Sequence, residues 1–161
     1  MEKEIVSNAS SLIFIEKAKI FNLVKNLYSR ILVPERVLKE IFKYNRPENI
    51  VIEQEINSGF IKLIKVRGVK DFPIHIGEKE AISLCLEKNI FLFLSDDKKA
   101  RRYARSLKIE TIGVLGVIIN NLKLKHINKR EARALMEKLI KEGYYMDPEL
   151  YAEVMKIGDF Y

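Results

Sequence analysis

A short apolar run followed at once by charged residues constrains the fold of this chain more than any other feature. Ile90-Phe91-Leu92-Phe93-Leu94 contains no charged or hydrophilic side chain, and Ser95-Asp96-Asp97-Lys98-Lys99 comes directly after it. Such a continuous apolar run is typical of a strand that is buried on both faces in the middle of a parallel sheet. The sequence therefore predicts a central strand over 90–94 whose carboxyl end leads into two acidic residues.

Strand-like and helix-like segments alternate along the rest of the chain. The expected strands cover 4–7, 31–33, 61–66 and 110–112. The expected helices cover 12–27 with a break near Lys19, a segment opened by Pro34, 48–57, a segment after Gly77, 97–107, and most of the chain from Gly113 on, with breaks near His126, Gly143 and Pro148. This alternation predicts an α/β fold with a mainly parallel sheet and helices on both faces. No repeat or linker interrupts it, so we expect one domain over residues 1–161.

Composition narrows the classes of function. The 161 residues include 29 Lys and Arg against 22 Asp and Glu, and the resulting charge of +7 favours polyanionic partners, nucleic acid ahead of a membrane surface. The single cysteine excludes an internal disulfide. Together with only two histidines it provides too few ligands to favour a Cys/His zinc site. The charged start at 1–4 and the short uncharged stretch 111–122 favour a cytoplasmic protein without a membrane segment.

Polar residues follow two of the expected strands, and ligands bind beyond the carboxyl ends of strands in parallel α/β sheets. Asn8 follows the first strand, and the pair Asp96–Asp97 follows the central one. Glu40 and Glu78 lie in the first two turns of helices that also follow strands. Carboxylates that converge on one point repel each other unless a proton or a cation compensates, and Mg²⁺ and Mn²⁺ prefer oxygen ligands. The alternative is that the aspartates only cap a helix and the glutamates are only solvated.

The helix expected after Asp97 is strongly basic. Its cationic side chains can hold the phosphate backbone of RNA beside the acidic residues; they are Lys98, Lys99, Arg101, Arg102 and Arg105. A charge run of this kind can also be an ordinary solvated helix face. Tyrosines near the end of the chain can stack on bases, although such residues more often pack a helix or a dimer contact. They are Tyr144, Tyr145, Tyr151 and Tyr161.

Four segments, in order, resemble the four motifs of the PIN domain. They are Ile5–Ile13, Val33–Ile41, Gly77–Leu84 and Leu94–Arg101. Two further segments, Thr111–Val117 and Gly143–Met146, are similar to a little-characterised prokaryotic PIN subfamily, which we expect to be archaeal and related to toxin–antitoxin ribonucleases. The resemblance spans nearly the whole chain.

The resemblance implies a three-layer α/β/α sandwich and an endoribonuclease that depends on Mg²⁺ or Mn²⁺. It also implies a possible toxin role, a homodimer and an antitoxin protein as partner. The acidic tetrad of the family falls on Asn8, Glu40, Glu78 and Asp97, with Asp96 as the competing choice for the fourth place. Ser10 matches the small hydroxyl residue that supports the first acid.

Asn8 departs from the family pattern, in which the first residue is Asp. An amide offers a carbonyl oxygen but no negative charge, so we expect a weakened metal site. Two alternatives remain open, and this departure favours the first of them. The chain can be a catalytically degenerate PIN-like module that binds RNA or a protein partner without cleavage, or a scaffold in which the acids are only helix caps.

Overall fold

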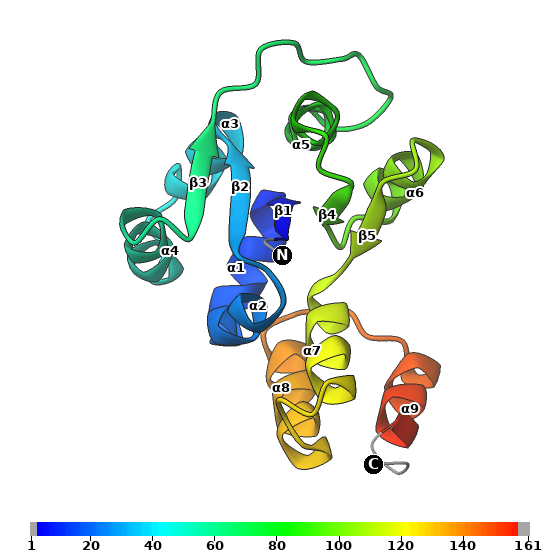
Figure 1. Cartoon of the computed structure of the whole chain (residues 1–161). Helices are drawn as coiled ribbons and strands as arrows, with labels where there is room; N and C mark the ends of the chain where they lie inside the picture. Colours follow the sequence, from blue (N-terminus) through cyan, green and yellow to red (C-terminus); the bar gives the residue numbers. More distant parts are fainter. Residues whose placement is uncertain (1–2, 158–161) are drawn as a thin grey trace.

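The computed structural model describes residues 3–157 (Figure 1). Residues 1–2 and 158–161, which include part of the charged amino-terminal segment and Tyr161, lie outside the described residues. The strands are β1 (Glu4–Ser7), β2 (Arg30–Pro34), β3 (Ile61–Ile64), β4 (Leu92–Leu94) and β5 (Glu110–Ile112). The helices are α1 (Ala9–Lys17), α2 (Phe21–Leu27), α3 (Glu35–Phe42), α4 (Glu48–Asn57), α5 (Ile76–Lys88), α6 (Lys98–Ser106), α7 (Val114–Lys123), α8 (Lys129–Lys141) and α9 (Pro148–Ile157).

The five strands form one parallel sheet in the order β3-β2-β1-β4-β5. Strand β1 lies in the centre, where Val6 is in register with Leu32 of β2 on one side and with Phe93 of β4 on the other. The strand order runs outward in both directions from β1, so the crevice at the carboxyl ends of β1 and β4 is the topological switch point of the sheet. Ligand sites of open α/β sheets lie at such a point.

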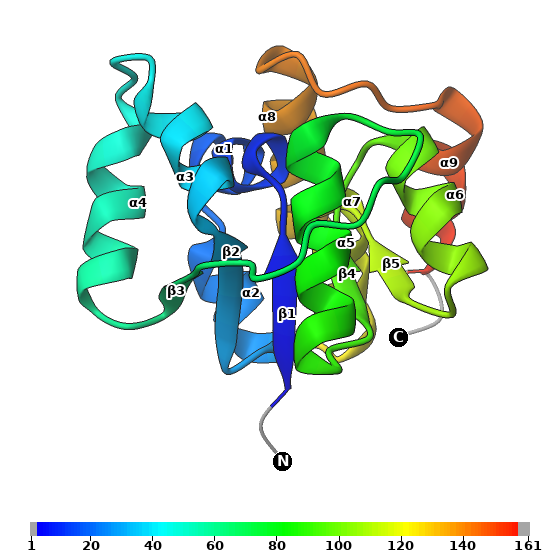
Figure 2. The same ribbon diagram turned by 90° about the horizontal axis from the view of Figure 1, so that it is seen from above.

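Helices cover both faces of the sheet (Figure 2), which confirms the predicted α/β/α sandwich. Helices α5 and α6 pack on the face that carries Val6, Leu32 and Phe93. The remaining helices pack on the face that carries Ile5 and Ile31. In the part of the chain that the structure describes, none of these helices has the length and apolar composition needed to cross a bilayer.

Local details differ from the expected boundaries. The strand predicted over 90–94 is β4, which begins at Leu92 and lies between β1 and β5 instead of at the centre of the sheet, and Phe91 before it is 47% exposed. Pro34 ends β2 and caps α3 with an extended ψ of 143° instead of opening the helix. Lys19 adopts a left-handed φ of 59° and separates α1 from α2, as the predicted break requires.

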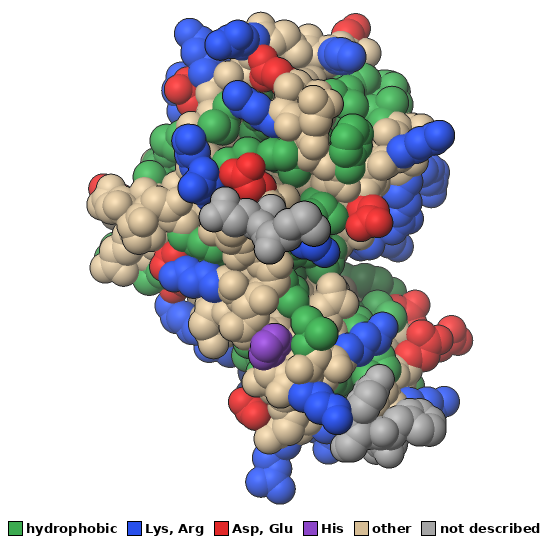
Figure 3. Space-filling model, in the orientation of Figure 1, with side chains coloured by type: hydrophobic (Ala, Val, Ile, Leu, Met, Phe, Trp, Pro, Cys, Tyr) green, Lys and Arg blue, Asp and Glu red, His purple; other side chains and the backbone are tan. Residues whose placement is uncertain are grey.

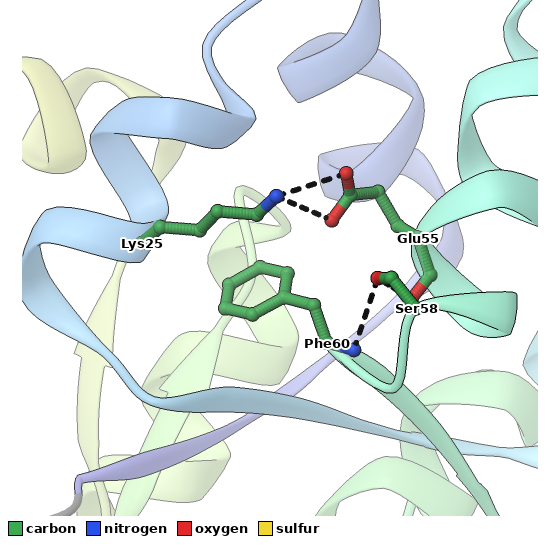
Figure 4. Close-up of polar contacts among 4 residues, drawn as sticks. All are labelled: Lys25, Glu55, Ser58 and Phe60. Atoms are coloured by element: carbon green, nitrogen blue, oxygen red, sulfur yellow. Dashed lines mark hydrogen bonds and ion pairs between the residues drawn. The ribbon is translucent and has the colours of Figure 1, made fainter.

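An ion pair at one edge of the sheet ties α2 to α4 (Figure 4). Nζ of Lys25 lies 3.0 Å and 2.9 Å from the two carboxylate oxygens of Glu55, and it also lies over the ring of Phe60. The Phe60 amide donates to the Ser58 hydroxyl at 3.4 Å just before β3 begins. These contacts hold α4 and the edge strand β3 against the body of the protein, beside α3.

Candidate metal-binding site

Asn8 lies at the carboxyl end of β1, in the crevice at the switch point. It is 1% exposed, and its Oδ1 accepts a hydrogen bond from the Ser11 amide at 3.1 Å, so it caps α1. Its Nδ2 donates to Oε1 of Glu78 at 3.0 Å and to the Ser95 hydroxyl at 2.9 Å. The amide oxygen is therefore used for capping, and the amide nitrogen faces the acidic residue.

Glu78 lies in the first turn of α5, which His75 caps by accepting from the Gly77 amide at 3.2 Å. One carboxylate oxygen of Glu78 accepts from Asn8, and the other is buried without a hydrogen-bond partner among the described residues. Burial raises the pKa of Glu78 to about 7; the Asn8 hydrogen bond lowers it, and the negative charges of Asp97 and Glu40 raise it. The carboxyl group of Glu78 is therefore only partly ionised near neutral pH.

Glu40 reaches the site from α3 by packing against the start of α5. A methyl group added at Gly77 would lie 3.1 Å from Oε1 of Glu40, so the missing side chain of Gly77 gives this carboxylate room next to Glu78. One turn earlier on α3, Arg36 is paired with Glu80 at 2.7 Å. Among the described residues, no cation forms an ion pair with Glu40, Glu78 or Asp97.

The two aspartates after β4 have different surroundings. Asp97 is exposed at the amino terminus of α6, where its Oδ1 accepts from the Ala100 amide at 2.7 Å, and its charge acts on Glu78. Asp96 lies against β5 and α7 instead. Its carboxylate accepts from the Ser11 hydroxyl at 2.8 Å, the Val114 amide at 3.1 Å and the Tyr144 hydroxyl at 2.6 Å.

Gly113 is required where Asp96 meets α7. A methyl group at this position would lie 2.4 Å from Oδ1 of Asp96, which is closer than any real contact. The Tyr144 hydroxyl completes the contact, and the ring of Tyr144 packs edge-on against Phe14 with centroids 5.3 Å apart. Burial and the charge of Asp96 raise the pKa of Tyr144, so the phenol stays protonated and donates.

Of Ser10, Ser11 and Ser95, only Ser10 was selected from the sequence, as the residue that supports the first acid. Ser10 is exposed, while Ser11 and Ser95 are buried and make the hydrogen bonds to Asp96 and Asn8. An asparagine at an N-cap bonds to the third helical residue, so placing the start of α1 correctly would have indicated Ser11. Tyr144 is 48 residues from Asp96, and no local pattern links the two.

The basic residues predicted on α6 begin directly after Asp97. Lys98, Lys99, Arg102 and Arg105 are exposed, and Figure 3 shows basic side chains gathered over this helix. Nε of Arg101 and Nε of Arg105 donate to the Thr111 hydroxyl of β5 at 3.4 Å and 3.1 Å. Two of the five cations are therefore held in place by the sheet edge.

The donor chemistry at the switch point suits a hard divalent cation, because three carboxylates share the region and one buried oxygen of Glu78 has no hydrogen-bond partner in the part of the chain that the structure describes. In the conformation described for residues 3–157, no three acidic, histidine or cysteine side chains lie close enough together to hold an ion as they stand. To bind an ion together, the side chains of Glu40 and Glu78 would have to move closer to each other and to Asp97.

The fold and the switch-point acids together define a parallel α/β/α protein of the PIN class. The family model of a PIN domain, DUF3368, matches residues 4–158, and the chain belongs to this family. It is similar in fold to a PilT N-terminus domain protein from the archaeon Sulfolobus solfataricus, with a TM-score of 0.57 and 21% identity over 74% of this chain and 93% of that chain. No curated protein matches the sequence. PIN domains are generally metal-dependent nucleases that use Mg²⁺ or Mn²⁺.

Proposed function

We propose that this protein is an endoribonuclease that depends on Mg²⁺ or Mn²⁺. The observation that carries the proposal is the acidic cluster at the switch point, where Glu78 has a pKa raised to about 7 and one buried oxygen without a hydrogen-bond partner in residues 3–157. Three carboxylates without a cation are unfavourable in a protein that has no ligand to compensate them. A reaction that needs a divalent cation and acts on a polyanion would explain why these carboxylates lie together.

Glu40, Glu78 and Asp97 would hold the ion, with Asn8 as a neutral fourth member. When bound, the ion would polarise the phosphodiester and neutralise charge that develops during hydrolysis. Glu78 must lose its proton before it can bind a cation. The Nδ2 group of Asn8 orients Glu78 through the 3.0 Å hydrogen bond.

Asp96 has a different role in this proposal. Its carboxylate already accepts from three protein donors, so it fixes the loop that carries Asp97 and leaves that residue as the metal ligand. The cations of α6 follow Asp97 directly and would hold the RNA backbone. They are Lys98, Lys99, Arg101, Arg102 and Arg105.

The test is cleavage of a structured RNA by the purified protein in Mn²⁺, with a chelator as the blank. Glu78→Gln removes one ligand charge and should lower the cleavage rate by about 100-fold or more. Asp71→Asn is the matched control, because Asp71 is an exposed acid whose one ion pair among the described residues is with Lys79. Cleavage that survives Glu78→Gln, or that persists in the chelator, would exclude this site as its source.

Asn8 favours a second candidate function, that of a catalytically degenerate module that binds RNA or a protein partner without cleavage. Its amide brings no negative charge, and its donor group already satisfies one oxygen of Glu78. Asn8→Asp distinguishes the two functions. Activity that appears only in this variant supports the degenerate module, whereas robust activity of the native chain excludes it.

The resemblance to toxin–antitoxin ribonucleases supports three further parts of the proposal: a toxin role, an antitoxin protein as partner, and a homodimer acting in the cytoplasm. The single cysteine, Cys85, is buried, which suits a reducing compartment. Growth arrest on expression, relieved by the product of a neighbouring gene, is the expected result for the toxin role. Light scattering of the purified protein measures the oligomeric state.

A further inference from the structure

A cleft of about 410 Å³ begins at Glu40 and is separate from the basic surface of α6. One wall is α3, and the other is the segment that follows β3. Its lining includes Arg36, Lys39, Glu40, Lys43, Lys65 and Val66. Because Glu40 belongs both to this α3 cleft and to the acidic cluster, a ligand that lies in the cleft would reach the proposed cleavage site.

The charges of the α3 cleft favour an anionic ligand. Of its cations, Arg36 is paired with Glu80 at 2.7 Å. Lys39 and Lys65 are exposed and form no ion pair among the described residues. Apart from Glu80, the acids that line the cleft are Glu35 and Glu40. Lys39 and Lys43 are one helical turn apart on α3, so they face the same side. Phosphate groups spaced along a strand would match this row of ammonium groups.

Exposed aromatic side chains lie on either side of Lys43, the last α3-side residue that lines the cleft. Tyr44 is 55% exposed, and Phe42 is 37% exposed beside a second cavity of about 510 Å³. Lys43 and Arg46 both lie over the Tyr44 ring, at 5.7 Å and 5.1 Å from its centroid. An exposed aromatic ring next to a cationic groove is the combination that binds single-stranded nucleic acid, because unpaired bases stack on the ring while lysines contact phosphates.

We propose that the α3 cleft binds single-stranded RNA on the side of the acidic cluster away from α6. Lys39, Lys43 and Lys65 contact phosphates, and a base stacks on Tyr44. This inference rests on the proposed ribonuclease function and adds the path of the RNA strand over this protein. A duplex fits less well, because its bases are already stacked and cannot cover the Tyr44 ring.

The test measures the binding of a fluorescein-labelled single-stranded RNA by anisotropy in the presence of a chelator, so that neither metal nor cleavage is needed. The double variant Lys39→Glu/Lys65→Glu should weaken binding by about tenfold or more and reduce the slope of log K against log salt by about 1.4. Tyr44→Ala should weaken single-strand binding by about tenfold, and Tyr44→Phe should bind like the native protein. A duplex of the same sequence should bind more weakly than the single strand and should not respond to Tyr44→Ala.

Two exposed positions away from the cleft provide matched controls. Lys123→Glu changes the same charge at the far end of α7, and Phe91→Ala removes an exposed ring before β4. Both should bind RNA like the native protein, and thermal unfolding checks that every variant is folded.

Three outcomes would overturn the inference. The first is that the α3 cleft variants bind RNA like the native protein while Lys98→Glu/Arg102→Glu on α6 abolishes binding. The second is that duplex and single strand bind equally and Tyr44→Ala has no effect. The third is that the native protein binds no RNA. A protein that binds as expected but cleaves nothing in Mn²⁺ would refute the nuclease proposal and leave the α3 cleft assigned.

Discussion

Asp96 and Glu78 are both acidic residues at the switch point, and their surroundings are opposite. Asp96 accepts hydrogen bonds from a serine hydroxyl, a backbone amide and a tyrosine hydroxyl. Glu78 accepts one from Asn8 and lies near two other carboxylates, and its second, buried oxygen has no partner within the described part of the chain. A fully satisfied acid stabilises the fold, whereas an unsatisfied one is costly unless a ligand compensates it.

The comparison also separates the two adjacent aspartates, which the sequence alone could not do. Asp96 joins α1, α7 and the segment after α8 through its three donors. Asp97 caps α6 and places its charge near Glu78. We therefore expect the loss of Asp96 to affect stability first, and the loss of Asp97 to affect metal binding and activity first.

The largest expected effect is that of Asp96→Ala on the free energy of unfolding. The substitution leaves the Ser11 and Tyr144 hydroxyls and the Val114 amide without their acceptor, and we expect a loss of about 3 kcal/mol. Asp97→Ala removes a helix cap but also removes a charge that repels Glu78, so its loss should be about 1 kcal/mol or less. Urea denaturation of both variants measures the difference. Equal losses would contradict the division of roles between the two aspartates.

A second prediction concerns the dependence of stability on pH. The pKa of Glu78 is raised from 4.5 to about 7, so between these values the folded protein binds a proton that the unfolded chain has released. Stability therefore falls as pH rises through this window, by about 2 kcal/mol between about pH 5 and about pH 7.5, and stays level above it. Urea denaturation across this range measures the change, and Glu78→Gln should remove this part of it.

Divalent cations should reverse this trend. Because the bound form needs an ionised Glu78, Mn²⁺ should stabilise the protein more at about pH 8 than at about pH 5.5. Thermal unfolding with and without Mn²⁺ measures the shift at each pH. An equal shift at both values, or an undiminished shift in Glu78→Gln, would count against a metal site that includes Glu78.

A smaller effect is expected from Asn8→Asp in the absence of metal. The substitution removes the amide donor and places a carboxylate about 3 Å from Oε1 of Glu78, where repulsion should cost about 1.5 kcal/mol at neutral pH. The helix cap is kept, because an aspartate oxygen can still accept from the Ser11 amide. Mn²⁺ should restore the lost stability and stabilise this variant more than the native protein. Denaturation with and without Mn²⁺ measures both effects, and an unchanged response to the ion would contradict the assignment of Asn8 to the metal site.

The sequence predicts the frame of this site well, for physical reasons. Apolar runs fix the strands, and ligand sites of parallel sheets lie at their carboxyl ends, so Asn8 and the Asp96–Asp97 pair could be placed at one edge from the chain alone. Glu78 could be placed in the first turn of a helix because Gly77 marks where that helix begins. Glu40 could likewise be placed in the first two turns of a helix that follows a strand, but its contact with Gly77 depends on how α3 packs against α5.

Other features could not be predicted, because they depend on contacts between distant segments. In the sequence, Asp96 and Asp97 are equally suitable as helix-capping residues. Their different roles follow from contacts of Asp96 with Gly113 and Tyr144, which lie in distant segments. The raised pKa of Glu78 depends on burial and on two charges from separate helices. The α3 cleft likewise forms between a helix and the segment after β3, and the sequence analysis did not identify it because no local pattern links these two walls.

The smallest expected effect is that of Tyr144→Phe, which removes one of the three donors to Asp96 together with the backbone hydrogen bond between Leu115 and the phenol. The edge-on contact with Phe14 is kept, because the ring remains, and Asp96 keeps the Ser11 hydroxyl and the Val114 amide. We expect a loss of about 1 kcal/mol in the free energy of unfolding, measured by urea denaturation, and little change in Mn²⁺ affinity. A large fall in Mn²⁺ affinity would show that Asp96 acts on the metal site and would remove the distinction between the satisfied and the unsatisfied acids. In the combined variant Tyr144→Phe/Asp96→Ala the two losses should be less than additive, because both changes break the same hydrogen bond.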